Sequence, residues 1–311
     1  MKIRIGTRGS ALALAQARAV AADLEAAGAS VEIVAMRTEG DRRAGARLAE
    51  VGGKGLFVRE IEDALLGGRI DVAVHSLKDL PAEVPDGLGL AAFPPREDPR
   101  DVLVTADGAG LDELREGATI GTSSLRRRAL LLAARPDLVV EPLRGNVDTR
   151  LAKLAAGGCD GIVLAAAGLR RLAVAPPHAH ALPVETFVPA VGQGILAVEV
   201  RADDVTTGRL ARLLDDGDTR PCALAERSYL RRLGASCNTP MAAHATLDRT
   251  GERPRLRMMA LVASEDGRRI LRADAAGAPG DAADVGRGLA ELLLERGAEA
   301  VAALDPSRWS P

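Results

Sequence analysis

The chain has 311 residues, of which 47% are hydrophobic and 27% charged, and this length is enough for two or three globular domains with buried cores. A formal net charge of −2 argues against a protein whose bulk basicity holds nucleic acid. No apolar run approaches the roughly 20 residues that span a bilayer, and the N-terminus lacks a basic start followed by a long apolar run. We therefore expect a cytoplasmic protein with no nucleic-acid or membrane partner.

Segments of β character alternate with helical ones, which predicts an α/β fold with mainly parallel sheets. A predicted strand at residues 3–8 leads through Ser10, a candidate N-cap, into a helix over residues 11–27. Strands over residues 31–36 and 70–75 and a helix over residues 55–66 follow, and a charged, proline-bracketed linker is expected at residues 94–100.

The alternation is then repeated, and it changes character near the C-terminus. The second series consists of strands over residues 118–122, 138–142 and 160–165, helices over 125–134 and 147–156, a glycine turn at 190–194 and a strand over 195–200. From Thr219 onwards we predict a helix over 222–233, strands near 244–247, 256–264 and 269–273, and a helix over 283–296. This last series is typical of a smaller α+β domain.

Three predicted strand-to-helix junctions combine capping residues with arginines. They are TRGS at residues 7–10, TSSLRR at 122–127, and RGN at 144–146 with Arg150 one turn further on. A helix N-terminus binds anions through its free N–H groups and its dipole, and arginine binds a carboxylate with two hydrogen bonds. Since parallel strands end at one edge of a sheet, the sequence predicts several anion sites facing one cleft. The alternative is ordinary helix capping beside solvated arginines.

Two further segments carry reactive or ligand-binding side chains. HSLKDLP places Lys78 beside Asp79 just past a predicted strand, where a carboxylate can act as a general acid or base. The alternative is a solvated charge pair in a turn. VGGKGLF predicts a flexible glycine loop with Lys54 and Phe57 that could cover a cleft, and the alternative is an ordinary mobile loop. Gln193 could hydrogen-bond a ligand, or the glycines beside it could simply form a turn where the chain crosses between domains.

The three cysteines are too few and too scattered for a disulfide framework, and the spacing of Cys and His residues does not suggest a metal site. Cys237 lies in a predicted loop, where a thiol can serve as a nucleophile, and the alternative is a loop thiol without a catalytic role. Cys159 and Cys222 are expected to be packing residues.

Taken together and in order, these segments resemble the porphobilinogen deaminase (hydroxymethylbilane synthase) family. The matching stretches are GTRGS, VGGKGLF, HSLKDLP, REDPRD, IGTSSLRRR, LRGNVDTRL, AAAGLRRL and PAVGQG, followed by a late loop cysteine. Each alone is weak, but together they cover the chain from Ile3 to about Val301.

The resemblance implies two domains like those of periplasmic binding proteins around a cleft, plus a smaller C-terminal α+β domain. It places the first domain at residues 1–94 and 195–214, the second at 99–190 and the third at 218–311. It also implies a monomeric transferase that joins four porphobilinogen molecules head to tail with loss of ammonia. The product is the linear hydroxymethylbilane, built on a dipyrromethane cofactor.

The resemblance also assigns site residues. Asp79 would be the catalytic carboxylate, protonating the departing amine and stabilising cationic pyrrole intermediates. Cys237 would hold dipyrromethane through a thioether. The remaining cofactor-binding residues would be Lys78, Thr122, Ser124, Arg126 and Arg127, and the substrate-binding residues Arg8, Ser10, Lys54, Phe57, Arg144, Arg150, Arg171 and Gln193.

Two other functional classes remain open at this stage. A solute-binding or sensor protein could use the same two-domain architecture without catalysis. A nucleic-acid binder could use Arg126–Arg128, although the acidic net charge and scarce aromatic residues count against it.

Overall fold

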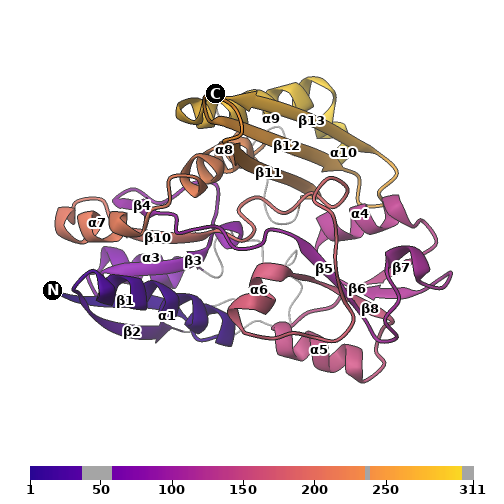
Figure 1. Cartoon of the computed structure of the whole chain (residues 1–311), viewed down its shortest axis with the longest axis horizontal. Coiled ribbons are helices and arrows are strands. Elements are labelled where there is room, and N and C mark those ends of the chain that lie inside the picture. Colours follow the sequence, from indigo (N-terminus) through magenta and orange to yellow (C-terminus); the bar gives the residue numbers. More distant parts are fainter. Residues whose placement is uncertain (37–57, 235–238, 303–311) are drawn as a thin grey trace.

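The computed structural model describes residues 1–36, 58–234 and 239–302, which form three units, each with its own sheet (Figure 1). The first unit has a five-stranded sheet of order β2-β1-β3-β10-β4. Its strands are β1 (Lys2–Arg8), β2 (Ser30–Met36), β3 (Val72–Ser76), β4 (Leu88–Ala92) and β10 (Leu196–Arg201).

The second unit also contains a five-stranded sheet, and the C-terminal unit a three-stranded one. The second sheet has the order β7-β6-β8-β5-β9, and the third is the antiparallel sheet β11-β12-β13. The strands are β5 (Asp101–Thr105), β6 (Thr119–Gly121), β7 (Val139–Glu141), β8 (Gly161–Ala165), β9 (Ala179–Ala181), β11 (Met241–Asp248), β12 (Arg255–Ala263) and β13 (Ile270–Gly277).

The prediction of mainly parallel sheets is wrong, because half of the pairings in the two α/β sheets are antiparallel. β1 runs parallel to β2 and β3, but β10 runs antiparallel to β3 and β4. Likewise β6 is parallel to β7 and β8, whereas β5 is antiparallel to β8 and β9. The first residue of β10, Leu196, pairs with the last of β3, Ser76, and Asp101 of β5 pairs with Ala165 at the end of β8. Each crossing strand thus enters a sheet where its parallel strands end, and must run back against them.

Helices cover both faces of each α/β sheet because the strands are apolar on both sides. Along β8, Ile162 and Leu164 belong to a core shared with α5 and α6, whereas Val163 belongs to the core under α4. In the first unit α1 covers one face and α3 the other. These helices are α1 (Ala11–Ala26), α3 (Arg59–Leu66), α4 (Leu125–Ala134), α5 (Val147–Ala155) and α6 (Ala166–Arg171), and α7 (Val205–Ala211) follows β10.

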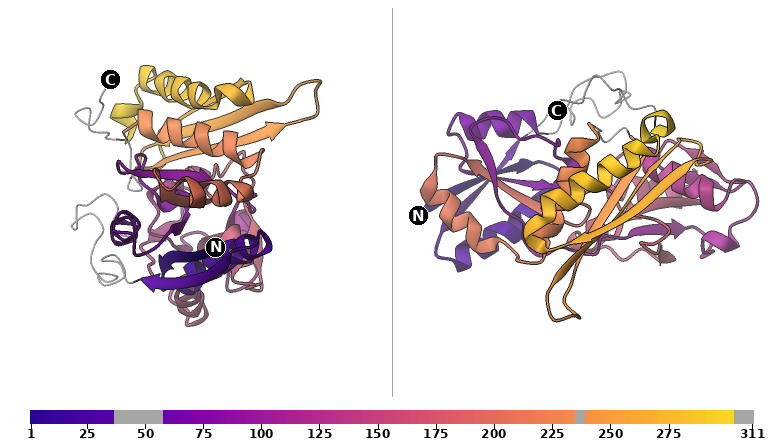
Figure 2. Two further views of the ribbon diagram at one scale, coloured as in Figure 1. Left: turned by 90° about the vertical axis from the view of Figure 1, so that its left-hand side faces the viewer. Right: turned by 90° about the horizontal axis from the view of Figure 1, so that it is seen from above.

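The C-terminal unit contacts both α/β units. Its helices are α8 (Thr219–Arg232), α9 (Ala282–Glu295) and α10 (Ala298–Ala302), and α9 crosses the third sheet in Figure 2. One face of this sheet packs on α8 and α9, while Leu261 from the other face shares a core with α4. Ala223 of α8 packs with Phe93 and Ile195 of the first unit. The predicted fold class, two α/β units with a smaller C-terminal α+β unit, is confirmed.

Most predicted elements are present with small shifts in their ends. Ser10 is the N-cap of α1, as expected, and its Oγ accepts a hydrogen bond from the Ala13 N–H at 3.3 Å. The helix predicted over residues 125–134 is α4, capped by Ser124. β4, β5, β9, α6, α7 and α10 were not predicted. In the described part of the chain, every helix is too short or too polar to cross a bilayer.

Candidate active site

The predicted anion-binding junctions lie at the ends of parallel strands, as their positions in the sequence suggest. In the first unit β1 ends at Arg8 and β3 at Ser76, and in the second unit β6 ends at Gly121. The two edges approach each other, because Arg171 at the end of α6 donates a hydrogen bond from Nη2 to the Gly194 carbonyl at 2.6 Å, where the chain enters the first unit. α6 also lies against α1, since a methyl group on Gly168 would be 3.8 Å from Leu12 Cδ2.

A pocket on the first unit brings Asp79 together with the first junction. Its lining includes Arg8, Ser10, His75, Ser76 and Asp79. Asp79 ends a short 3-10 helix, Leu77–Asp79, and its side chain is exposed, so a ligand can reach the carboxylate. Arg8 and Ser10 are half-buried. The pocket therefore combines an accessible carboxylate with a guanidinium, a hydroxyl and the N-terminus of α1.

Lys78 links this pocket to the arginines of the second unit. Burial lowers its pKa to about 8, Arg127 and Arg126 act in the same direction, and Asp79 and Asp101 oppose them. An arginine changes the pKa of Lys78 through charge only when it is near. Lys78 of the first unit therefore lies near the arginines of α4.

The TSSLRR junction is built around the first turn of α4. The Oγ of Ser124, the N-cap, accepts a hydrogen bond from the Arg127 N–H at 3.4 Å, and Thr122 Oγ1 accepts one from the Ser124 N–H at 3.2 Å. Both hydroxyls therefore hold the junction in shape. The predicted alternative of helix capping is correct for Ser124, and capping leaves the Ser124 hydroxyl proton free for an acceptor.

Arg126 and Arg127 are buried and bind Asp101, a residue that the sequence analysis did not assign to the site. Arg126 Nη1 lies 2.7 Å from Asp101 Oδ2, and Arg127 Nη2 lies 2.8 Å from Asp101 Oδ1. Burial by itself acts to raise the pKa of Asp101, but the two guanidiniums outweigh it and hold the pKa far below its usual value. Arg127 also donates to protein oxygens from Nε, Nη1 and Nη2, and its assignment to cofactor binding stays a prediction.

The other predicted arginines lie near the same edge. Arg150 Nε donates to the Gly145 carbonyl at 2.8 Å, and its pKa is lowered by burial and by Arg127. Arg144 is half-buried, and its carbonyl accepts a hydrogen bond from Lys153 Nζ at 3.3 Å. Burial lowers the pKa of Arg171 to about 10. These guanidiniums remain cationic at neutral pH and give the edge a positive potential.

Gln193 lies in a turn that needs both of its flanking glycines. Gly192 has φ 72° and Gly194 has φ 88°, values that disfavour side chains. A Cβ on Gly192 would lie 2.8 Å from Leu77 Cγ, and one on Gly194 would lie 2.3 Å from the Glu97 carbonyl oxygen. Because both residues lack side chains, the turn can lie close to Leu77, which precedes Lys78, and to Glu97, in the segment of residues 94–100 that links the two α/β units. Buried Gln193 donates from Nε2 to Pro99 O at 2.7 Å and to Asp101 Oδ1 at 3.0 Å.

Two further buried pairs of ionisable side chains were also missed. Arg96, in the crossing at residues 94–100, pairs with Glu226 of α8 at 2.6 Å, and the same carboxylate accepts the Gly192 N–H at 2.6 Å. His75 and Glu199 pair at 2.9 Å in the first unit. Asp, Glu and Arg are common at exposed positions, so residue type alone did not distinguish these buried partners.

Three predicted site residues, Lys54, Phe57 and Cys237, lie outside the described residues. The other two cysteines are described. Burial raises the pKa of Cys222 to about 12 and also raises that of Cys159, so both are thiols at neutral pH. This agrees with their expected role as packing residues.

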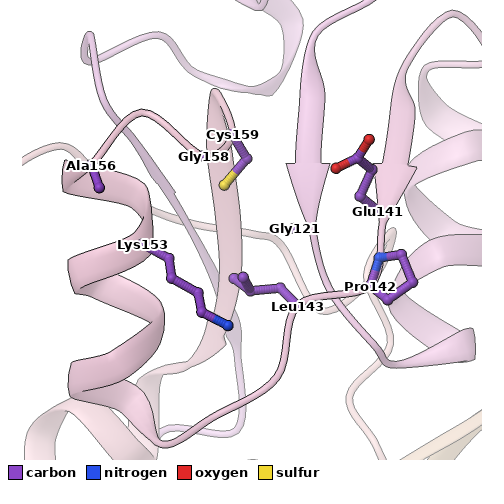
Figure 3. Close-up of a pocket in the computed structure, with 8 residues that line it drawn as sticks. All are labelled: Gly121, Glu141, Pro142, Leu143, Lys153, Ala156, Gly158 and Cys159. Carbon is purple, nitrogen blue, oxygen red and sulfur yellow. The ribbon is translucent and has the colours of Figure 1, made fainter. Parts of the chain in front are cut away.

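A second, larger cavity of about 250 Å³ has none of the predicted site residues in its lining, although Gly121 and Leu143 in that lining directly precede Thr122 and Arg144. It is bounded by α5, the end of β7 and the start of β8 (Figure 3). Lys153 reaches along it towards the loop at Leu143, and Glu141 lies on the opposite side. This cavity lacks the converging cations of the facing edges, so we do not assign the reaction to it.

Comparisons with known proteins identify the family. Residues 3–209 match "Porphobilinogen deaminase, dipyromethane cofactor binding domain", and residues 221–295 match "Porphobilinogen deaminase, C-terminal domain". The chain is 51% identical to the porphobilinogen deaminase of Syntrophotalea carbinolica, with 97% of this chain and 96% of the relative covered. It is 49% identical to that of Brevibacillus brevis, with 96% and 95% covered.

Among solved structures, the periplasmic VFT2 domain of Bordetella pertussis BvgS is similar with a TM-score of 0.40 and 16% identity, over 69% of this chain and 85% of that one. The two family matches and the two relatives near 50% identity support the enzyme over the solute-binding alternative. The chain therefore belongs to the porphobilinogen deaminase family, and it is a transferase with a dipyrromethane cofactor that polymerises porphobilinogen into hydroxymethylbilane.

Proposed function

We propose that the facing edges of the two α/β units form the active site of this transferase, with Asp79 as its catalytic carboxylate. The observation that carries this proposal is the pocket that joins Asp79 to Arg8 and Ser10, next to Lys78 and the arginines of α4. An exposed carboxylate beside several cations suits a substrate that loses an amine and carries carboxylates of its own.

In this proposal Asp79 assists the departure of ammonia in two ways: it donates a proton to the amine, and it stabilises the positive charge left on the substrate. The amine of porphobilinogen leaves as ammonia, and positive charge develops on the carbon that carried it. A carboxylate in contact with that carbon stabilises the charge, and in its protonated form it donates a proton to the departing amine. Because Asp79 is exposed in the pocket, the substrate can reach it directly.

The cationic and hydroxyl side chains bind the acetate and propionate groups of the pyrrole rings. Arg126 is better suited to direct contact than Arg127, since its Nε is buried without a hydrogen-bond partner. Arg127 contributes its charge while its nitrogens hold the protein together. The remaining binding residues in this proposal are Arg8, Ser10, Lys78, Thr122, Ser124, Arg144, Arg150, Arg171 and Gln193, with Lys54 and Phe57 from residues that the structure does not describe.

The described residues suit the dipyrromethane cofactor, whose two rings also carry carboxylates. Arg126 Nε offers an unused buried donor, and Lys78, Thr122 and Ser124 lie on the adjoining edges. When bound, the cofactor supplies the pyrrole carbon to which the first substrate is joined. We assign its thioether attachment to Cys237, in the segment between α8 and β11.

Substrate binding is expected to depend on the protonation of Lys78. Its pKa of about 8 means that the ammonium is present below that pH and lost above it. Substrate carboxylates are ionised throughout this range, so KM for porphobilinogen should rise as the pH increases through about 8. Steady-state kinetics across this range test the expectation. Lys78→Met should show a higher KM without this rise, whereas Lys2→Met, which alters an exposed pair with Glu32, should behave as wild type. Equal pH profiles for Lys78→Met and wild type would contradict the assignment.

The proposed activity is tested by incubating the purified chain with porphobilinogen. We expect one ammonia released for each porphobilinogen consumed, together with a linear tetrapyrrole product. Binding of porphobilinogen without release of ammonia would instead identify a binding protein.

We further propose domain boundaries at residues 1–94 with 195–214, 99–190 and 218–311. The strand membership of the three sheets supports them, since β1–β4 and β10 share the first sheet and β5–β9 the second. We also propose that the enzyme is a cytoplasmic monomer that binds no nucleic acid. The net charge of −2 supports the absence of a nucleic-acid partner.

A further inference from the structure

The chain passes between the two α/β units twice, at residues 94–100 and at the turn of residues 190–194. Asp101 links both of these crossings to the arginines of α4. It begins β5, directly after the crossing at residues 94–100, and its side chain is fully buried. The carboxylate accepts hydrogen bonds from Arg126 Nη1 at 2.7 Å, Arg127 Nε at 3.1 Å and Arg127 Nη2 at 2.8 Å. It also accepts one from Gln193 Nε2, in the second crossing, at 3.0 Å.

Two buried guanidiniums placed side by side repel each other and have lost much of their hydration. They remain together because a carboxylate lies between them. Within residues 1–36, 58–234 and 239–302, Asp101 is the one carboxylate that forms an ion pair with either guanidinium. One negative charge against two positive charges leaves this cluster with a net charge of +1.

The cluster retains hydrogen-bonding capacity that the protein does not use. Arg126 Nη1 is shared between Asp101 and the Val188 carbonyl, but Arg126 Nε is buried and has no partner in the described part of the chain. The Oε1 of Gln193 is likewise buried and unpartnered. Such groups are costly to bury unless a ligand or water satisfies them. Lys78 of the first unit lies near enough for its pKa to respond to this cluster.

We propose that Asp101 is a positioning residue of the active site, holding Arg126, Arg127 and Gln193 so that Arg126 meets a carboxylate of the pyrrole chain. This inference rests on the proposed function. Asp101 itself does not touch the substrate, because its oxygens are occupied by the side chains that it orients.

Whether ligand affinity falls or rises when Asp101 is removed distinguishes a positioning role from a purely electrostatic one. Asp101 is negative, so its charge alone weakens the binding of an anion, and its removal by itself would tighten binding. If Asp101 instead fixes the guanidiniums, its removal lets them separate and weakens binding although the cluster gains positive charge.

The test compares the Asp101→Asn holoenzyme with wild type, after intact mass has established that the cofactor is loaded. The probe is a pyrrole with the acetate and propionate of porphobilinogen but with a methyl group in place of the aminomethyl group, so that it cannot react. Calorimetry should show Kd raised by about tenfold or more, the loss expected for a misplaced charge-assisted hydrogen bond. The kcat/KM for porphobilinogen should fall about 100-fold. An unchanged or lower Kd would overturn the proposal.

Asp71→Asn is the matched control. Asp71 also lies between two arginines, Arg4 at 2.8 Å and Arg201 at 3.4 Å, but it precedes β3, at the end away from Lys78 and Asp79. The Asp71→Asn substitution should lower the melting temperature of the protein while leaving Kd for the probe unchanged. An equal rise of Kd in the control would show that loss of stability, and not positioning, explains the effect.

A double variant keeps the test decisive if Asp101→Asn fails to fold. Asp101→Asn with Arg127→Gln removes one charge of each sign, so the cluster keeps its net charge of +1. The protein should then fold, yet the probe should still bind more weakly than to wild type because Arg126 has lost its anchor. Wild-type affinity in the double variant would overturn the role of Asp101. Failure of wild type itself to release ammonia from porphobilinogen would overturn the proposed function instead.

Discussion

Replacing Asp79 by Asn should lower kcat for porphobilinogen about 10²- to 10⁴-fold, the usual contribution of a positioned acid or base. The amide has the same shape, but it neither donates a proton to the departing amine nor stabilises the developing positive charge. Asp79 is exposed, so the substitution should change the free energy of unfolding by no more than about 0.5 kcal/mol. Steady-state assays of ammonia release, with a thermal melt and an intact mass, measure these effects separately.

Glu83→Gln provides the matched control for Asp79→Asn. Glu83 is another exposed carboxylate, four residues further along the chain, and it does not line the pocket. Its replacement should leave kcat close to that of wild type. Near-normal turnover of Asp79→Asn would remove Asp79 from the chemistry.

Replacing Cys237 by Ser should abolish covalent attachment of dipyrromethane. A thiolate is a strong nucleophile, whereas a serine hydroxyl without an activating base is not, so the thioether has no counterpart in the variant. The intact mass of the variant should equal that of the unmodified chain. Turnover should fall to background because chain growth lacks its starting point.

Cys159→Ser is the control for this experiment. Burial raises the pKa of Cys159, which keeps it a thiol at neutral pH, and Cys159 lines the cavity beside α5 and is not one of the predicted site residues. This variant should carry the full cofactor mass. A cofactor adduct on Cys237→Ser, or its loss from Cys159→Ser, would move the attachment to another residue.

The arginines illustrate how far the sequence can assign a site. The TSSLRR segment predicted a cap followed by anion-binding guanidiniums, and Ser124 is the cap of α4. The same segment does not distinguish Arg126, whose Nε has no partner among the described residues, from Arg127, whose Nε, Nη1 and Nη2 each donate to a protein oxygen. That difference depends on Asp101, which is 25 and 26 residues away in sequence. Only contacts made after folding could reveal it.

The direction of the strands is a second feature that the local sequence does not specify. Alternating strands and helices predict parallel pairing when each connection returns within one unit. β5 and β10 arrive from the neighbouring unit and run antiparallel to β8 and β3. Nothing local in their apolar sequences specifies that direction, because it depends on which edge of the sheet the incoming strand meets.

The sequence by itself determined the α/β class, the positions of most helices, the cap Ser10 and the family, whereas it left Ser123 and Ser124 as alternative caps of α4. These features depend on local periodicity, capping chemistry and the order of short segments. Only the tertiary structure decided which charges are buried together, such as Asp101 with Arg126 and Arg127, and Arg96 with Glu226. The physical reason is that the pKa and the hydrogen-bonding capacity of a charged side chain depend on its neighbours and its exposure to water, and residues distant in sequence provide both.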